Sequence, residues 1–317
     1  MRYRPLGTSG LVVSVVGLGC NNFGRAVDLD GTRAVVDAAL DAGVTLLDTA
    51  DVYGNRGGSE SLLGEALKGR REQVVLATKF GMDMGGANGP DWGARGSRRY
   101  VRRAVEASLE RLQTDWIDLY QYHAPDGVTP IEETLAALDE LVTEGKVRYV
   151  GSSNFAGWQV ADAEAVARRD GVTRFVSAQN SYSLLDRTPE RELVPACAHY
   201  GVGILPYFPL ANGLLTGKYR RGEPPPEGTR LAARGAAISD RSFDAVEALE
   251  QFAIERGRTL LDVAIAGLAA LRAVGSVIAG ATRPAQVQAN AAAGDWQPTA
   301  EDLAALNAIV RPMRAVR

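Results

Sequence analysis

Short apolar segments alternate along the chain with longer stretches in which apolar residues recur every three or four positions. The longer stretches are typical of amphipathic helices, and residues 31–43, 97–113 and 130–145 are the clearest examples. The first ends at Gly43, a common helix stop, and the third begins with Pro130 and two acidic residues, which suit a helix N-terminus. The short apolar segments are predicted to be strands: 15–19, 44–48, 74–79, 116–121, 146–153, 174–179, 203–207 and 276–280.

This alternation predicts an α/β protein, because strands separated by helices form parallel βαβ units. Eight units predict a closed (β/α)8 TIM barrel. We expect residues 1–317 to form a single domain, with an N-terminal extension before the first barrel strand and an extra helix at the C-terminal end. The alternative is an open doubly wound sheet, which normally carries a G-x-G-x-x-G turn after its first strand. Here the first strand leads into "GLGCNNFG", where the glycine spacing is different.

Two long loops follow predicted strands and therefore belong to the C-terminal face of the barrel. Residues 81–97 are rich in glycine, and residues 211–240 contain the "GEPPPEG" segment, whose three prolines disfavour helix and central strand alike. Active sites of this fold lie on that face, so the long loops predict where a ligand binds.

Charge and cysteine content narrow the functional classes. The 35 basic and 38 acidic residues give a net charge of −3, which argues against a basic nucleic-acid-binding protein. The cysteines, Cys20 and Cys197, do not suggest a disulfide framework, and no apolar segment has the length of a membrane span. We therefore expect a cytoplasmic protein, by default a monomer, that acts on a small molecule and binds neither nucleic acid nor membrane.

Ionisable residues gather where consecutive predicted strands end. Asp48 ends the second strand and Tyr53 follows it, Lys79 ends the third, and His123 follows the fourth. Each residue alone has an ordinary explanation, such as a cap, a packing contact or a surface charge. Together they form a proton-transfer unit, because an ammonium group lowers the pKa of a neighbouring tyrosine from ~10 and itself needs a carboxylate partner. The order of these residues predicts that Lys79 pairs with Asp48 and tunes Tyr53.

Two other kinds of site are disfavoured. A glycoside hydrolase built on a barrel needs two facing carboxyl groups, and Asp48 has no evident acidic partner at the strand ends. The two histidines are far apart and no cysteine cluster accompanies them, so no metal site is predicted.

Over essentially its whole length the sequence resembles the aldo-keto reductase superfamily, including its branch related to potassium-channel β subunits. The resemblance rests on seven motifs in order: "LLDTADVYG", "LATKFG", "YQYHAP", "YVGSSNF", "AQNSYSLL", "PYFPLANGLLTGKY" and "GATRPAQVQAN". It implies a catalytic tetrad of Asp48, Tyr53, Lys79 and His123. Tyr53 would be the general acid of carbonyl reduction, and His123 would position the substrate carbonyl.

The resemblance also implies a nicotinamide dinucleotide, usually NADPH, with NADH possible. Ser153, Asn154 and Gln179 would hold the carboxamide, and Tyr207 would stack on the nicotinamide ring. The remaining contacts are expected on two segments after the seventh and eighth strands: Phe208, Leu210, Gly213, Leu214 and Lys218, then Gly280, Thr282, Arg283, Gln286 and Asn290.

The chain departs from many family members in two respects. Phe208 replaces a serine, and Gly280 or Gln286 stands where a basic residue is common. Arg283 remains as the candidate clamp for the 2′-phosphate of NADPH, a role that suits its planar donor fork.

The sequence thus predicts an NADPH-dependent oxidoreductase that reduces aldehydes or ketones to alcohols. The alternative is a cofactor-binding regulatory module, which binds a partner and keeps residual reductase activity. Substrate choice would depend on loops that contain Phe23 and Trp92 and on residues 211–240. That last segment, with Lys218, Arg220, Arg221, Arg230 and Arg234, is expected to be mobile and to close over the bound dinucleotide.

Overall fold

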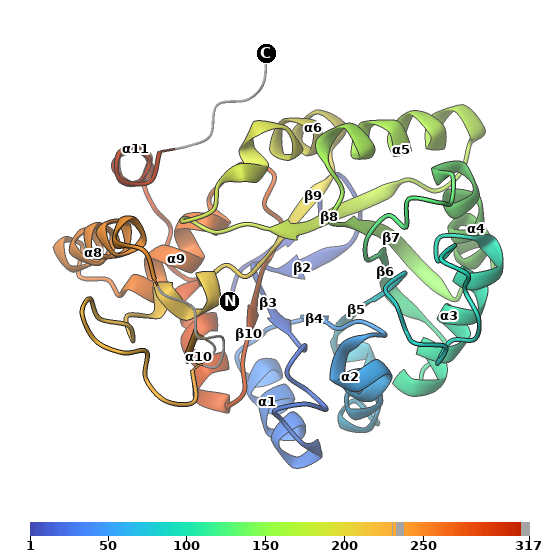
Figure 1. The fold of residues 1–317 in the computed structure, drawn as a ribbon, viewed down its shortest axis with the longest axis horizontal. Helices are drawn as coiled ribbons and strands as arrows, with labels where there is room; N and C mark the ends of the chain where they lie inside the picture. The colour runs from blue at the N-terminus through green and yellow to red at the C-terminus, as the bar shows by residue number, and fades with distance from the viewer. Residues whose placement is uncertain (230, 233–237, 312–317) are drawn as a thin grey trace.

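Eight parallel strands curl into a nearly closed barrel in the computed structural model, which describes residues 1–229, 231–232 and 238–311 (Figure 1). The open seam lies between the two strands at the ends of the order. There the Ile204 N–H donates to the Ala273 carbonyl at 2.7 Å, and the Ile204 carbonyl accepts from the Gly275 N–H at 2.8 Å. The sheet order is β10-β3-β4-β5-β6-β7-β8-β9. The strands are β3 (Val16–Gly19), β4 (Leu46–Asp48), β5 (Val75–Phe80), β6 (Ile117–Tyr122), β7 (Val147–Ser153), β8 (Phe175–Ser181), β9 (Gly203–Tyr207) and β10 (Val277–Gly280).

Helices surround the barrel and connect its strands (Figure 1). The predicted TIM-barrel fold is therefore confirmed, and each predicted strand or helix named above matches an observed element to within about two residues at either end. The α-helices are α1 (Leu29–Asp41), α2 (Tyr53–Ala66), α3 (Arg98–Leu112), α4 (Ile131–Thr143), α5 (Gly157–Asp170), α6 (Leu193–Tyr200), α8 (Asp240–Glu255), α9 (Leu260–Ala269), α10 (Pro284–Ala293) and α11 (Ala300–Ile309), and the 3-10 helices are η1 (Arg71–Gln73), η2 (Thr188–Arg191) and η3 (Ala211–Thr216).

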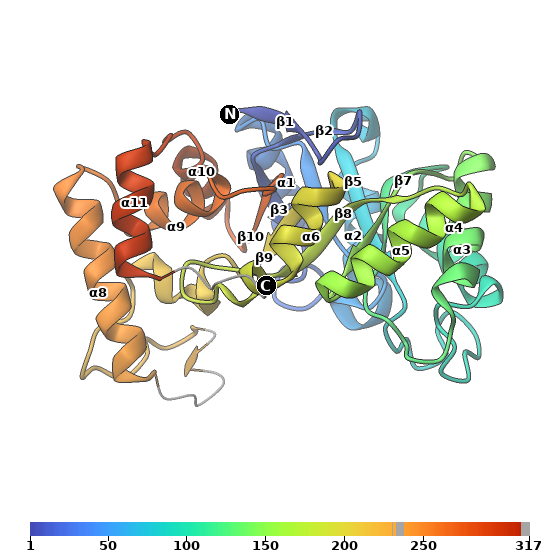
Figure 2. The ribbon, with the colours of Figure 1, turned by 90° about the horizontal axis from the view of Figure 1, so that it is seen from above.

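The base of the barrel is covered by a hairpin of β1 (Tyr3–Pro5) and β2 (Val12–Ser14), at the top of Figure 2. Its apolar side chains pack against the inward side chains of the barrel strands, and Arg4 donates to the carbonyls of Ala269 and Val274 at 3.0 Å each. The buried cluster at this base consists of Leu6, Leu11, Val13, Leu46, Ala77, Leu119, Leu205 and Ile278.

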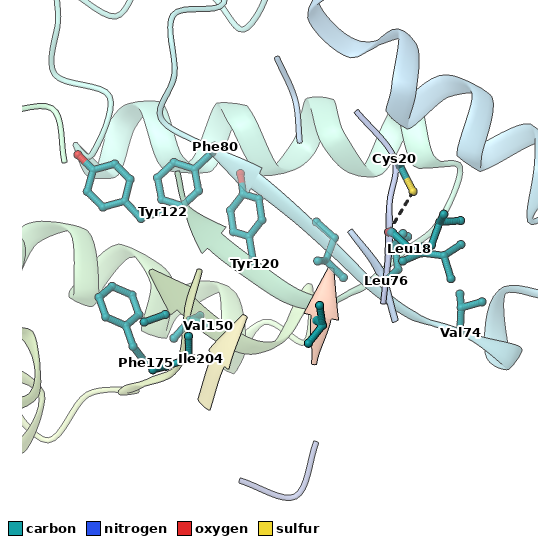
Figure 3. Packing of buried hydrophobic residues seen from close by; sticks show 14 of the residues in the cluster. Leu18, Cys20, Val74, Leu76, Phe80, Tyr120, Tyr122, Val150, Phe175 and Ile204 are labelled. Carbon is teal, nitrogen blue, oxygen red and sulfur yellow. Dashed lines mark hydrogen bonds between the residues drawn. The ribbon is translucent and has the colours of Figure 1, made fainter. Parts of the chain in front are cut away.

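A second buried layer lies between the barrel and its outer helices. Aromatic rings on β5 and β6 dominate one part of it, where Phe80 stacks on Tyr120 at 4.8 Å and on Tyr122 at 5.1 Å between ring centroids (Figure 3). Offset aromatic stacks add to the energy of apolar burial. This packing holds the C-terminal ends of β5 and β6 together, and those ends carry Lys79 and His123.

The segment after β9 is anchored to neighbouring elements at several of its described residues. Its first residues form η3, its last residue begins α8, and two of its arginines are tied to that helix. Arg220 binds Glu250 at 2.9 Å, and Arg221 binds both Asp244 at 2.6 Å and Glu247 at 2.9 Å. In this structure Arg220 and Arg221 thus pair with acidic residues of α8, and closure of the segment over a bound dinucleotide stays a prediction. Arg230 and Arg234 lie outside the described residues.

Helix α8 contacts α11, and the two helices lie side by side in Figure 2. Arg187, after β8, fixes the end of α11 by donating to Asn307 Oδ1 at 2.7 Å and to the Val310 carbonyl at 2.8 Å. These contacts attach the C-terminal helix to the segment that follows β8.

Candidate active site

The polar layer of the barrel follows from the two-residue period of its strands. Leu46, Ala77 and Leu119 face the inside at the base, so the residues two positions later also face inward. Those residues are Asp48, Lys79 and Gln121, and all three are buried near the C-terminal end of the barrel. The apolar base thus gives way to a buried polar layer beneath the rim.

Lys79 and Asp48 form the ion pair that the sequence predicts. Lys79 Nζ lies 2.6 Å from Asp48 Oδ2, and the lysine side chain is 0% exposed. Burial acts to lower the pKa of Lys79, but the charges of Asp48 and Tyr53 outweigh it and raise that pKa above its ordinary value. Lys79 therefore stays an ammonium inside the barrel, where an unpaired charge would be costly.

Tyr53 stands at the start of α2, with its hydroxyl 3.4 Å from Lys79 Nζ. Four successive residues with positive φ, 54–57, follow it and separate it from the regular part of the helix. Gly54 is required in this turn, because a Cβ atom there would collide with Phe23 O and Ser59 N. The turn fixes the direction in which the Tyr53 ring enters the site.

The pKa of Tyr53 is raised, whereas the sequence predicts that it is lowered. Burial raises it above 10.0, and the opposing effect of the Lys79 charge does not offset that cost. The prediction that Lys79 lowers the Tyr53 pKa below its ordinary value is therefore wrong for the protein alone. Lys79 limits the rise instead.

His123 follows β6 and its ring lies edge-on to Tyr53, with 5.8 Å between ring centroids. Burial, together with the nearby Lys79 charge, lowers the pKa of His123 to about 3. The imidazole is therefore neutral at physiological pH, and its buried Nδ1 atom has no hydrogen-bond partner within the described part of the chain. This leaves a neutral imidazole beside the Tyr53 ring.

The residues expected at the nicotinamide are linked to one another and to the tetrad. The Tyr207 hydroxyl donates to Asn154 Oδ1 at 2.7 Å, and Asn154 Nδ2 donates to Ser153 Oγ at 3.2 Å and to the His123 carbonyl at 2.9 Å. Gln179 is buried deeper and donates to Asp48 Oδ1 at 2.8 Å. The structure therefore brings all four residues to the barrel mouth that holds the tetrad.

The remaining expected contacts lie on two neighbouring segments of the rim. Gln286 accepts from the Thr282 N–H at 2.8 Å and from the Thr282 hydroxyl at 3.1 Å, whereas the Arg283 side chain is exposed and makes no hydrogen bond or ion pair with the described residues. Gly280 is exposed and Asn290 is buried. The other segment, from β9 to just past η3, carries Phe208, Leu210, Gly213, Leu214 and Lys218, of which Phe208 and Lys218 are exposed.

The two residues expected to influence substrate choice differ in accessibility. Trp92 is 77% exposed, and the guanidinium of Arg99 lies 4.4 Å from its ring centroid. Phe23 is completely buried in the hydrophobic core and cannot line a binding surface in this conformation. The expectation for Phe23 is therefore wrong, because its loop folds back and contacts the turn at Gly54.

Sequence reasoning missed Gln121, which donates from Nε2 to Asp48 Oδ1 at 3.1 Å. The two-residue period that links Leu119 to Gln121 could have identified it. It also missed a buried polar network behind the ion pair. Asn88 Nδ2 donates to Asp51 Oδ2 at 3.1 Å, and Arg111 Nε donates to Glu60 Oε2 at 2.7 Å, with a longer contact of 3.4 Å from Arg111 to Asn88 Oδ1.

Asp51 should make the stability of the protein depend on pH. Burial and the Glu60 charge raise its pKa to about 8, while Arg111 opposes them. Between about pH 4 and about pH 8 the folded state keeps a proton that the unfolded state has released, so stability falls as the pH rises. Asp51→Asn should remove this slope, which is at most about 1.4 kcal/mol per pH unit.

Urea unfolding of both proteins across that pH range measures the slope. Asp162→Asn is the control, because Asp162 is exposed on α5. A slope unchanged by Asp51→Asn, or reduced equally by Asp162→Asn, would contradict the assignment to Asp51.

Two further searches covered only the residues that the structure describes. They contain no group of three or more histidine, cysteine, aspartate or glutamate residues placed to hold a metal ion. In the same residues, no helix combines the length and apolar character needed to cross a membrane.

Comparisons with known proteins agree with this geometry. The chain is 42% identical over 273 residues to YrpG, an uncharacterised oxidoreductase of Bacillus subtilis, covering 84% of this chain and 82% of the relative. It is 35% identical over 325 residues to a probable voltage-gated potassium channel subunit beta of Oryza sativa, covering 98% and 97% of the two chains. It is also 33% identical over 305 residues to the L-glyceraldehyde 3-phosphate reductase of Escherichia coli K12, covering 92% and 86%. A model of the aldo/keto reductase family matches residues 15–311, and the chain belongs to that family.

Proposed function

We propose that this protein reduces aldehydes or ketones to alcohols with NADPH as the preferred hydride donor and NADH as an alternative. The observation that carries the proposal is the unbroken contact from Asp48 through Lys79 to the Tyr53 hydroxyl, at 2.6 Å and 3.4 Å. Family membership supports it, as do relatives named as reductases, including the versiconal hemiacetal acetate reductase of Aspergillus parasiticus.

Tyr53 is the proposed proton donor. Because burial raises its pKa, the hydroxyl keeps its proton at neutral pH until a stronger base is present. A carbonyl oxygen becomes such a base when hydride reaches the carbonyl carbon, and Tyr53 then transfers its proton to that oxygen. The phenolate left behind is stabilised by the Lys79 ammonium 3.4 Å away until solvent returns the proton.

His123 is the proposed orienting group. A neutral imidazole donates one hydrogen bond and carries no charge that would compete with Lys79. With a pKa of about 3, His123 holds this state through the pH range in which the protein would work. It can therefore direct a carbonyl oxygen toward Tyr53 without itself supplying the proton.

The rim residues fit a nicotinamide dinucleotide, which supplies the hydride when bound. Asn154 and Ser153 offer amide and hydroxyl groups at the level of the tetrad, and Tyr207 presents a partly exposed ring beside them. Arg283, at the N-cap of α10, offers an exposed guanidinium without an acidic partner in the described chain. Gln179 is proposed to contact the carboxamide through the part of its amide that does not bind Asp48.

Arg283→Ala should weaken NADPH binding by roughly tenfold and change NADH binding little, because an exposed charge-assisted contact to phosphate is modest. Dissociation constants for both cofactors, measured by quenching of protein fluorescence, test this expectation. Arg272→Ala is the matched control, since Arg272 is also exposed but precedes β10 instead of following it. If Arg283→Ala weakens the binding of NADPH and NADH equally, Arg283 does not bind the 2′-phosphate of NADPH.

The direct test is turnover with a panel of aldehydes, ketones and sugars, each assayed with NADPH and with NADH. Consumption of NADPH that depends on a carbonyl compound supports the proposed reductase. The second candidate is a cofactor-binding regulatory module, favoured by the likeness to the plant proteins named as probable potassium channel β subunits. Tight cofactor binding without turnover across the whole panel would favour that module.

A further inference from the structure

Gln121 is tightly packed inside the barrel. It lies on β6, where it pairs in register with Lys79 on β5 and with Gly151 on β7, and it is 0% exposed. A Cβ atom on Gly151 would lie 3.2 Å from Gln121 Cγ and would collide with Ser177 Oγ. A side chain at position 151 would therefore crowd Gln121 from the neighbouring strand.

Both ends of the Gln121 amide are used. Its Nε2 donates to Asp48 Oδ1 at 3.1 Å, and its Oε1 accepts from Gln179 Nε2 at 3.1 Å. Gln179 Nε2 also donates to Asp48 Oδ1, at 2.8 Å. An ionised carboxylate only accepts hydrogen bonds, so Asp48 determines which end of each amide faces it.

The same carboxylate controls the direction of the lysine protons. An ammonium group has three donors, and those of Lys79 reach Asp48 Oδ2 at 2.6 Å, the Thr49 carbonyl at 2.8 Å and the Tyr53 hydroxyl at 3.4 Å. With two protons held by Asp48 and Thr49, the third is directed at Tyr53. Rotation of the Asp48 carboxylate would therefore redirect the proton that contacts the tyrosine.

We propose that Gln121 is a positioning residue for the reaction: it locks the Asp48 carboxylate, and through Asp48 it aims the Lys79 ammonium at the Tyr53 hydroxyl. The inference rests on the proposed reductase function. It assigns no contact with substrate or cofactor to Gln121. The role needs a side chain that donates to Asp48 and accepts from Gln179, which an amide does and an alkyl group does not.

Two substitutions separate this role from simple packing. Gln121→Leu keeps the volume but removes both hydrogen bonds, and kcat should fall about tenfold or more with a smaller change in KM, because the bonds lost are to a charged group. Gln121→Glu keeps the shape, and its carboxyl group both donates and accepts while it is neutral. Near pH 5 its kcat should therefore return to within a fewfold of the wild-type value.

As the pH rises, the introduced carboxyl group of Gln121→Glu ionises and stops donating. The titratable groups around this position are the like-charged Asp48 from β4, the opposing Lys79 from β5, Tyr53 from α2, His123 after β6 and Cys20 after β3. Repulsion from Asp48 then adds to the lost hydrogen bond, so kcat of Gln121→Glu should fall at least tenfold toward about pH 9. The pH profiles of the wild type and of Gln121→Leu should not show this decrease.

Gln251→Glu is the matched control, because Gln251 Nε2 also donates to a carboxylate, Glu255 Oε1 at 3.0 Å, but on the exposed surface of α8. Its profile should superpose on that of the wild type. A kcat of Gln121→Leu within twofold of wild type would overturn the proposal. So would a Gln121→Glu protein no more active than Gln121→Leu at every pH.

If the wild type turns over no substrate, the reductase function is refuted. The role of Gln121 in holding Asp48 can then still be tested by unfolding in urea. The Gln121→Glu protein should become less stable as the pH rises. Adding Asp48→Asn to it should make this pH-dependent change in the unfolding equilibrium constant at least tenfold smaller. Additive effects of the two substitutions at every pH would show that Gln121 does not hold Asp48.

Discussion

Replacing Tyr53 by phenylalanine is expected to lower kcat for carbonyl reduction by roughly 10²–10⁴-fold, the usual contribution of a positioned general acid. The substitution removes the transferable proton and leaves the ring edge-on to His123. Because Lys79 keeps its bonds to Asp48 and the Thr49 carbonyl, the ion pair should survive. NADPH binding should therefore change little, as measured by fluorescence titration beside steady-state kinetics.

Tyr3→Phe provides a matched control for this experiment. Tyr3 also loses a hydroxyl hydrogen bond, to the Gly43 carbonyl at 2.9 Å, but it lies in the hairpin at the opposite end of the barrel. Its kcat should equal that of the wild type. Comparable turnover by Tyr53→Phe would exclude Tyr53 as the proton donor and would leave His123 as the residue to test next.

Lys79→Met should abolish activity and also destabilise the fold, unlike Tyr53→Phe. Removing one member of a buried ion pair leaves the other charge without compensation, at a cost of about 3–5 kcal/mol. Asp48 is the charge that remains, buried and bonded among the described residues to the amides of Gln121 and Gln179. We expect no measurable turnover and a clear decrease in the free energy of unfolding measured in urea.

A double substitution separates the two losses. Asp48→Asn combined with Lys79→Met removes both charges, so the double variant should recover most of the stability lost by Lys79→Met while remaining inactive. Lys68→Met is the control for loss of a lysine, because Lys68 pairs with Glu65 on the surface and should have little effect. If the double variant is no more stable than Lys79→Met, Lys79 does not stabilise the protein through Asp48.

Strand periodicity and motif order were enough to predict the barrel and the meeting of the tetrad. Alternation places Asp48 and Lys79 on the inner face regardless of loop details, and the parallel order brings neighbouring strand ends together. The environment of each group is harder to predict, since it depends on packing from distant parts of the chain. The sequence identified the Lys79 neighbour of Tyr53 but could not show that burial outweighs it.

The residues that the sequence interpretation missed depend on partners from distant parts of the chain. Gln121 is uncharged and lies inside a motif whose histidine draws attention, and its importance depends on a glycine of the next strand. Asp51 lies within three residues of the tetrad, yet its raised pKa depends on burial, then on Glu60 and on the limited compensation by Arg111 of a later helix. To predict that Arg221 pairs with α8, one must likewise know which face of that helix is turned toward residues 211–240. Such partners are fixed by tertiary structure.

The hairpin at the barrel base also has a consequence for the order in which the chain can fold during synthesis. Residues Arg2 and Arg4 are made before every element that they finally bind, yet their hydrogen-bond partners are the carbonyls of Ala269, Val274, Gly294 and Trp296. The hairpin cannot make these contacts until the last barrel strand has left the ribosome. Closing the base of the barrel with these contacts is therefore a late step of folding, because it joins residues that are 265 to 294 positions apart in the sequence.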